Sequence, residues 1–272
     1  MLFVIPSYKR VNILESLTLK FLERMEILNK TYHRIIVYTA NEYEFAEYSN
    51  ALENKFSNLE IELGSLGIMK QRNIMNDLSK TSNCIVSIDD DIENLYITNN
   101  GIQRPLGKKE FHQLLSFMEK CLNQSKSNII GLSLNTNPFY HSKKLSTTLA
   151  VIPAGFYMIG KHYPNTIYND ALEDIERSLN YFIEDGIIMR IMNISFHRKD
   201  FNKKRQGGIQ ALYNNQERNS LLKEGFEEIK KKYPKFINGY SKKEIVKLKK
   251  YRSKFDIGNL NKQYKELFFL EV

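Results

Sequence analysis

The sequence lacks a long apolar run. A membrane-spanning helix needs about 18 or more consecutive apolar residues, and no such run occurs in the 272 residues. The apolar segment at residues 1–5 is far shorter than the core of a signal peptide and predicts a buried first strand. We therefore expect a protein without a membrane segment, in a cytoplasmic setting.

Cysteine is equally scarce. Cys84 and Cys121 are the two cysteines, and they fall in a predicted strand and a predicted helix, which favours reduced core thiols over a disulfide framework. The sequence also has no zinc-ligand spacing, no Ser/His/Asp set and no Walker phosphate loop. Internal repeats and low-complexity linkers are absent too, so these classes of protein are set aside.

Positive charge is abundant and unevenly placed. The formal net charge is +9, and basic clusters recur from Lys199 onward: Lys203, Lys204 and Arg205; Lys230 to Lys232; Lys242 and Lys243; Lys247, Lys249, Lys250 and Arg252. Such a basic region is either a solvated surface or the electrostatic footprint of a polyanion. Nucleic acid is therefore a candidate partner.

The order of apolar patterns predicts an α/β fold. Buried-strand patterns at residues 2–5, 34–39, 59–63 and 84–88 alternate with helical patterns at 11–28, 42–53 and 68–78. This alternation favours a mostly parallel, doubly wound, Rossmann-like sheet. Further along, helices are predicted at 108–122, 171–184, 217–232 and 241–252, and strands at 129–134, 148–152, 156–160 and 187–196. We expect a catalytic domain at 1–208 and a helical, Lys-rich extension at 209–272, packed on it.

The acidic triplet Asp89, Asp90 and Asp91 ends one of these strands. Adjacent carboxylates repel one another unless a cation or hydrogen-bond donors compensate them. Because alternate residues of a strand face the same way, Asp89 and Asp91 are predicted to hold a Mg²⁺ or Mn²⁺ ion together with substrate phosphates. The alternative is an acidic turn that caps a helix at 92–96.

Two later segments carry further candidates. Glu173 and Asp174 begin a helix, where they are either capping acids or the carboxylate base of a group transfer. His197 follows a strand and is a candidate third metal ligand, or a plain surface or core residue. Lys204, Gly207 and Gly208 are predicted to belong to a mobile loop that closes over a diphosphate.

Taken together, four segments resemble the GT-A class of glycosyltransferases, which includes family 2: residues 3–10, 67–73, 88–92 and 172–174. More narrowly, residues 2–230 resemble the TET-associated glycosyltransferases of phages, which are thought to add sugars to hydroxymethylated pyrimidines in DNA. This likeness rests on residues 19–22, 42–48 and 207–210 and on the basic tail.

The resemblance implies a metal-dependent enzyme with a nucleotide-diphosphate sugar, a UDP-sugar, as donor. It assigns Asp89 and Asp91 to the metal and, with Asp90, to the donor, and it assigns Asp174 or else Glu173 to the base. The nucleotide pocket would be lined by Pro6, Ser7, Arg10 and Arg72. The broader family usually has Tyr-Asn where this chain has Tyr8, Lys9 and Arg10. This departure leaves the base of the donor nucleotide undetermined.

DNA is the acceptor that the resemblance and the basic tail favour, with Tyr213, Tyr233 and Tyr240 as candidates for stacking on a base. A glycan, lipid or protein acceptor is the alternative within the same chemistry. From other classes, a nucleotidyltransferase would need a Gly-rich, Lys-bearing first loop, and a non-catalytic nucleic-acid binder would not explain the aspartate triplet. No protein partner is implied, and a phage enzyme would act in the host cytoplasm.

Overall fold

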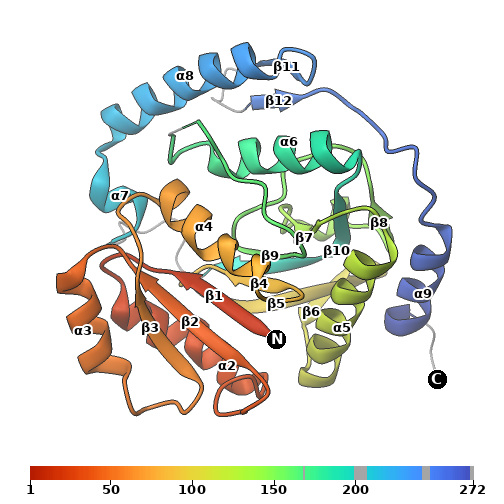
Figure 1. Cartoon of the computed structure of the whole chain (residues 1–272). Coiled ribbons are helices and arrows are strands. Elements are labelled where there is room, and N and C mark those ends of the chain that lie inside the picture. Colours follow the sequence, from red (N-terminus) through yellow and green to blue (C-terminus); the bar gives the residue numbers. More distant parts are fainter. Residues whose placement is uncertain (168, 199–206, 241–245, 270–272) are drawn as a thin grey trace.

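The structure is a computed structural model that describes residues 1–167, 169–198, 207–240 and 246–269. A ten-stranded sheet forms its centre, in the order β3-β2-β1-β4-β9-β7-β10-β5-β6, with β8 paired to β10 (Figure 1). The strands of this sheet are β1 (Leu2–Pro6), β2 (Arg34–Thr39), β3 (Leu59–Leu63), β4 (Ile85–Ile88), β5 (Ile92–Asn99), β6 (Ile102–Pro105), β7 (Ile129–Ser133), β8 (Leu145–Ser146), β9 (Phe156–Ile159) and β10 (Met189–Arg198).

Most strands of this sheet run in one direction. The pairs β1–β2, β2–β3, β1–β4 and β7–β10 are parallel, whereas β9, β5 and β8 run against their neighbours. The predicted α/β class with a mostly parallel sheet is therefore confirmed.

Helices cover both faces of the sheet. They are α1 (Val11–Leu14), a π-helical turn (Glu15–Leu19), α2 (Lys20–Arg24), α3 (Glu42–Leu52), α4 (Ile68–Asn76), α5 (Lys108–Gln124), α6 (Glu173–Asp185), α7 (Ile209–Leu212), α8 (Asn215–Lys232) and α9 (Gly258–Phe269). Short 3₁₀ turns lie at Asp77–Lys80 and Pro138–Tyr140. None of the described helices is long and apolar enough to cross a membrane.

Alternation along the strands builds two cores. On β1, Phe3 and Ile5 join a cluster with α2, α3, α5 and α9, whereas Leu2 and Val4 join a second cluster with α6 and α8. This is the period-2 pattern of a strand that is buried on both faces. Both clusters include residues beyond position 208, such as Phe226 in α8 and Leu260 in α9. The proposed domain boundary at 208/209 stays a prediction.

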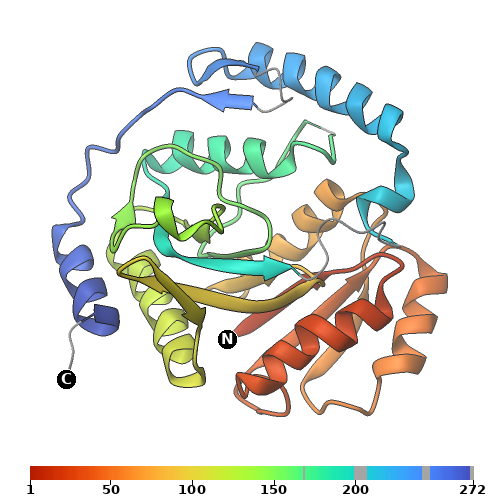
Figure 2. The same ribbon diagram turned by 180° about the vertical axis from the view of Figure 1, so that it is seen from behind.

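The C-terminal part differs from its predicted form. Helix α8 confirms the helix predicted at 217–232 and crosses the molecule beyond α6 (Figures 1 and 2). The helix predicted at 241–252 is wrong, because β12 (Val246–Leu248) pairs with β11 (Ile237–Tyr240) as a small hairpin. The strand predicted at 148–152 is also wrong: Thr148 forms only an isolated bridge, to Arg252, and the Ile152 N–H donates to the Ser178 hydroxyl.

Two features of the fold position the site. The carboxyl ends of β1 and β4 lie at the same edge of the sheet because these strands are parallel. Strand β5 follows the aspartate triplet directly and pairs with β10, so that Arg198 lies opposite Ile92. The alternative of a helix at 92–96 is thereby excluded.

Candidate active site

A cavity of about 460 Å³ opens at the carboxyl ends of β1 and β4, beside the first turns of α4 and α6. Ligands of open α/β sheets bind at this edge, and the volume lies in the range of small-molecule sites, about 300–1,000 Å³. The polar side chains that line it are Ser7, Tyr8, Arg10, Ser65, Gln71, Arg72, Asp89, Asp90, Asp91, Asp170, Glu173, Asp174, Arg198 and Arg218. Pro6 and Gly208 also line it. The structure thus brings most of the predicted residues together.

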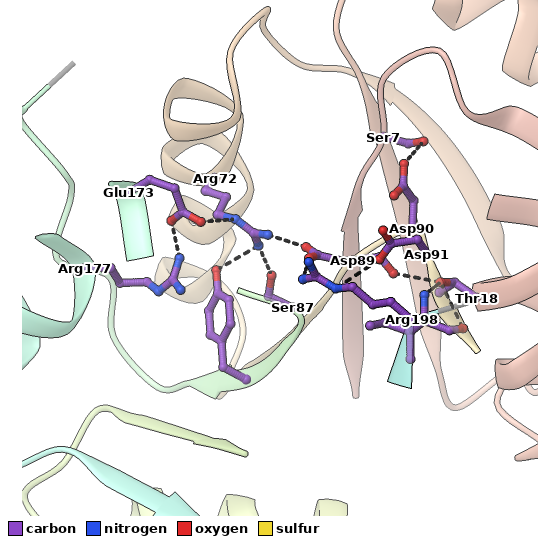
Figure 3. A network of polar contacts seen from close by, with 12 residues as sticks. Ser7, Thr18, Arg72, Ser87, Asp89, Asp90, Asp91, Glu173, Arg177 and Arg198 are labelled. Atoms are coloured by element: carbon purple, nitrogen blue, oxygen red, sulfur yellow. Dashed lines mark hydrogen bonds and ion pairs between the residues drawn. The ribbon is translucent and has the colours of Figure 1, made fainter. Parts of the chain in front are cut away.

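Guanidinium groups compensate the aspartate triplet (Figure 3). Asp89 accepts hydrogen bonds from Arg72 and Arg198. Burial alone would raise the pKa of Asp89, but the two arginines outweigh it and hold this pKa below its usual value. Asp91 forms ion pairs with Arg10 at 3.4 Å and Arg198 at 3.2 Å. The repulsion expected from adjacent carboxylates is therefore offset by arginine.

Asp90 is joined through Arg10 to the same network and is also bonded to the loop after β1. It accepts from the Ser7 hydroxyl at 2.7 Å and from Arg10 at 3.1 Å, and Ser7 also bonds the Tyr48 hydroxyl at 2.8 Å. Burial raises the pKa of Asp90 to about 6, although Arg10 opposes the shift. Ser7 and Asp90 thus join the loop after β1 to the end of β4.

Arg72 is a buried cavity residue that connects the aspartate triplet to α6. It is fully buried on α4 and bridges Asp89 to Glu173, whose carboxylate lies 3.1 Å from the Arg72 Nε. Glu173 is also paired with the buried Arg177, and the Arg177 guanidinium lies 4.3 Å from the centre of the Tyr157 ring. Both guanidinium groups thus engage the Glu173 carboxylate. We therefore assign Glu173 a positioning role.

Asp174 has the properties that a base requires. It lines the cavity at the start of α6 and is partly exposed there. Burial, together with the neighbouring Glu173, raises its pKa to about 6. Among the described residues, no side chain donates a hydrogen bond to its carboxylate, whose partner is the backbone N–H of Ile175. A carboxylate with a pKa near neutrality is suited to accepting a proton.

The paired glycines close one wall. The Gly208 N–H donates to the Tyr8 carbonyl at 2.8 Å, and Arg10 donates to the Gly207 carbonyl at 3.3 Å. Gly207 has a φ of +83°, and a Cβ there would lie 2.5 Å from Arg10 Cγ and from two backbone oxygens. Glycine is required by both the conformation and the close contact. Lys204, predicted in the same loop, lies outside the described residues.

His197 is not brought to the aspartates. Its ring is half-exposed, bonds Glu93 at 3.2 Å and contacts the edge of Tyr96; it does not line the cavity. His197 and Arg198 are neighbours on β10, and neighbouring residues of a strand point to opposite faces; the pairing with β5 also shifts register between them. Arg198 takes the position for which His197 was predicted.

The predicted metal centre does not fit these side chains. Asp89 and Asp91 supply the one or two carboxylates that Mg²⁺ uses beside substrate phosphates, but both are engaged by arginines. Within the described residues, no group of three or more His, Cys, Asp or Glu side chains could hold a metal ion. We therefore derive no step through a metal.

Three cavity residues were missed by the sequence analysis. Arg198 and Arg218 carried no signal beyond lying in a basic region. Asp170 caps the first turn of α4, since the Met69 N–H donates to its carboxylate at 3.0 Å. It also accepts from the Tyr213 hydroxyl at 3.3 Å. Strand and helix termini identified the edge of the sheet, but not which distant arginines reach it.

No family model and no curated protein matches the chain. Among solved structures, it is similar to S. aureus TarS 1–349 in complex with UDP-GlcNAc, with a TM-score of 0.45 and 14% identity over 84% of this chain and 66% of that chain. Against TarS 1–349 alone the TM-score is 0.44, with 14% identity over 72% of this chain and 58% of that chain. The chain thus spans less than two thirds of these proteins. A function for this chain has to be inferred from the residues of its own cavity.

Proposed function

We propose that the chain is a glycosyltransferase that uses a nucleotide-diphosphate sugar, and that Asp174 is its general base. The observation that carries the proposal is one cavity that combines arginines at the strand ends with a carboxylate whose pKa is raised to about 6. Cations suit a diphosphate, and the carboxylate suits the proton of an acceptor hydroxyl. The motif order shared with GT-A enzymes supports the same reaction.

In this reaction the acceptor oxygen attacks the anomeric carbon while its proton passes to Asp174. The bond between the anomeric carbon and the diphosphate oxygen breaks, and the electron pair leaves with the diphosphate. Negative charge therefore grows where the guanidinium groups lie, which lowers the energy of the transition state. A single base on one side of the sugar implies inversion of the anomeric centre.

We further propose that the donor is a UDP-sugar, as the motif resemblance implies. Pro6, Ser7 and Gln71 line the cavity beside Ala40 and Ile68, and provide polar and apolar surface for a base and ribose. A panel of UDP-, GDP-, ADP- and dTDP-sugars, followed by measurement of the released nucleoside diphosphate, tests this proposal. Turnover with another nucleotide alone would overturn the uridine assignment.

DNA with hydroxymethylated pyrimidines is the proposed acceptor. Lys230 and Lys231 are exposed in the last turn of α8. Arg218, in the first turn of the same helix, lines the cavity. At about 1.5 Å per residue, the lysines lie about 18 Å or more along the helix from Arg218, about five base pairs of duplex at 3.4 Å each. A duplex held by the lysines would thus extend to the cavity.

The stacking role of tyrosines is not supported where the structure describes them. Tyr233 is buried, and its hydroxyl bonds Glu176 and Asn180. Tyr213 donates to Asp170. The side chain of Tyr240 lies outside the described residues. We therefore base the DNA proposal on charge alone.

The acceptor test offers the enzyme and the donor panel duplexes with hydroxymethylcytosine or hydroxymethyluracil, beside glycan and peptide acceptors. A nucleoside heavier by one sugar supports the DNA proposal; modification of only a glycan or peptide overturns it. The double variant K230Q/K231Q should bind duplex more weakly and with a shallower salt dependence, by about 0.9 in log–log slope per lost phosphate contact. The matched variant K109Q/K120Q, which removes two lysines of α5, should bind as the wild type does.

A further inference from the structure

Arg198 lies between the two carboxylates that a divalent ion would need (Figure 3). Its Nη2 donates to Asp89, and its Nε lies 3.2 Å from Asp91 Oδ1. The planar guanidinium fork matches paired carboxylate oxygens better than a point charge does. One cationic group therefore already joins Asp89 to Asp91.

Arginines, rather than a metal ion, compensate the aspartate triplet in the part of the chain that the structure describes. Three carboxylates, Asp89 to Asp91, face three guanidinium groups, those of Arg10, Arg72 and Arg198. A divalent ion at Asp89 and Asp91 would have to displace Arg198 from both, and would place two further positive charges beside the displaced one. Repulsion between like charges in a buried site opposes that exchange.

Arg218 adds a cation to the same cavity. It extends from the first turn of α8 and lines the cavity with Arg198. Within the described residues, no carboxylate forms an ion pair with Arg218, and its buried Nε has no hydrogen-bond partner. A buried donor without a partner is unfavourable unless a ligand satisfies it. The group is thus suited to an anion that enters the cavity.

We infer that Arg198 and Arg218 bind the donor diphosphate directly, and that Arg198 occupies the place of the divalent ion, so that diphosphate binding is metal-independent. This inference rests on the proposed function and specifies which arginines of the same site bind the diphosphate. Arg198 is held by Asp89 and Asp91 through its Nη2 and Nε and lines the cavity, while Arg218 approaches from α8.

The test measures binding of UDP and of inorganic pyrophosphate by calorimetry, in excess Mn²⁺ and in excess EDTA. We expect wild-type affinity to be the same in both conditions. Because charge-assisted hydrogen bonds are lost, R218Q should weaken UDP binding by about tenfold to a hundredfold. R104Q is the matched control, since Arg104 pairs with Glu110 at the surface.

A second measurement follows free Mn²⁺ by electron paramagnetic resonance, without nucleotide. Wild-type protein should leave Mn²⁺ free in solution. R198Q, in which Asp89 and Asp91 have lost their shared guanidinium, should bind Mn²⁺ more tightly than the wild type. A thermal melt of each variant checks that the fold is retained, and R198K tests whether positive charge without the fork suffices.

The outcomes separate the two proposals. UDP binding that requires Mn²⁺ overturns metal independence and leaves the proposed glycosyltransferase intact. Wild-type affinity in R218Q overturns the role of Arg218. No binding of UDP, pyrophosphate or any nucleotide sugar in either condition overturns the proposed function, and this inference with it.

Discussion

Replacing Asp174 by Asn should lower turnover strongly while making the protein more stable. A positioned base contributes about a hundredfold or more to turnover, which corresponds to about 2.7 kcal/mol in activation free energy. Asn cannot accept the acceptor's proton, but it has nearly the same shape and keeps an oxygen for the Ile175 N–H. Donor binding should therefore change little.

The stability gain follows from the pKa of Asp174, which is raised from 3.8 to about 6 in the folded protein. That difference corresponds to about 3 kcal/mol against the ionised folded form. Because the side chain is partly exposed at the cavity, we discount the gain from Asn to about 1–3 kcal/mol. At about 2–4 °C for each kcal/mol, the melting temperature should rise by several degrees at neutral pH.

The stability difference between wild type and D174N should depend on pH. Since the folded pKa is raised, the wild type keeps its full stability below pH 4 and loses this contribution as pH rises through 6. The melting temperatures of wild type and D174N should therefore agree near pH 4 and separate by pH 7. The control is D185N, at the other end of α6, where the carboxylate bonds Asn128 and Tyr163; it should retain full turnover. Full turnover in D174N, or a lower melting temperature at pH 7, would refute the assignment.

The remaining predictions concern the surroundings of this base. Turnover should decrease as the pH is lowered through about 6, because Asp174 must be ionised to accept a proton. The pKa of Asp90 is also raised to about 6, so a pH profile in which D90N alone removes this decrease would contradict the assignment. Glu173→Gln should lower the free energy of unfolding by about 3 kcal/mol or more, seen as an earlier denaturant midpoint, because it leaves Arg72 short of a buried partner. Gly207→Ala should cost about 1–3 kcal/mol and weaken donor binding, because φ is +83° and the added methyl group meets the loop after β1; wild-type melting and affinity would refute this.

Much of the fold was correctly anticipated from the sequence, and most of the predicted site residues line the cavity. Runs of apolar residues placed β1, β2, β3 and β4, and the loops that follow parallel strands identified the ligand edge. Asp174 was a candidate because a group transfer needs a carboxylate base, although acidic residues are common in the first turn of any helix. The sequence could not rank Glu173 and Asp174, since their roles differ only through Arg72 and Arg177, which reach Glu173 from elsewhere in the fold.

The hairpin of β11 and β12 shows another limit. Residues 246–248 fit a helical pattern as well as a strand, because short segments rich in lysine carry little periodic signal. Their conformation is decided by pairing: Leu248 lies opposite Ile237, and the Lys249 N–H donates to the Phe236 carbonyl. Such contacts override local propensity.

The aspartate triplet shows which part of the chemistry could not be inferred from the sequence. Three adjacent carboxylates at a strand end require compensation by a cation or by donors, and the sequence established that requirement without deciding between the two. The decision depends on Arg10, Arg72 and Arg198, which are far apart in the chain and meet only because β1, α4 and β10 end at one edge of the sheet. It also depends on the end of β10, where Arg198 contacts Asp91 and the preceding His197 bonds Glu93 instead. Without Arg198, Asp89 and Asp91 would lose the guanidinium group that they share, and both carboxylates would be available to a metal ion.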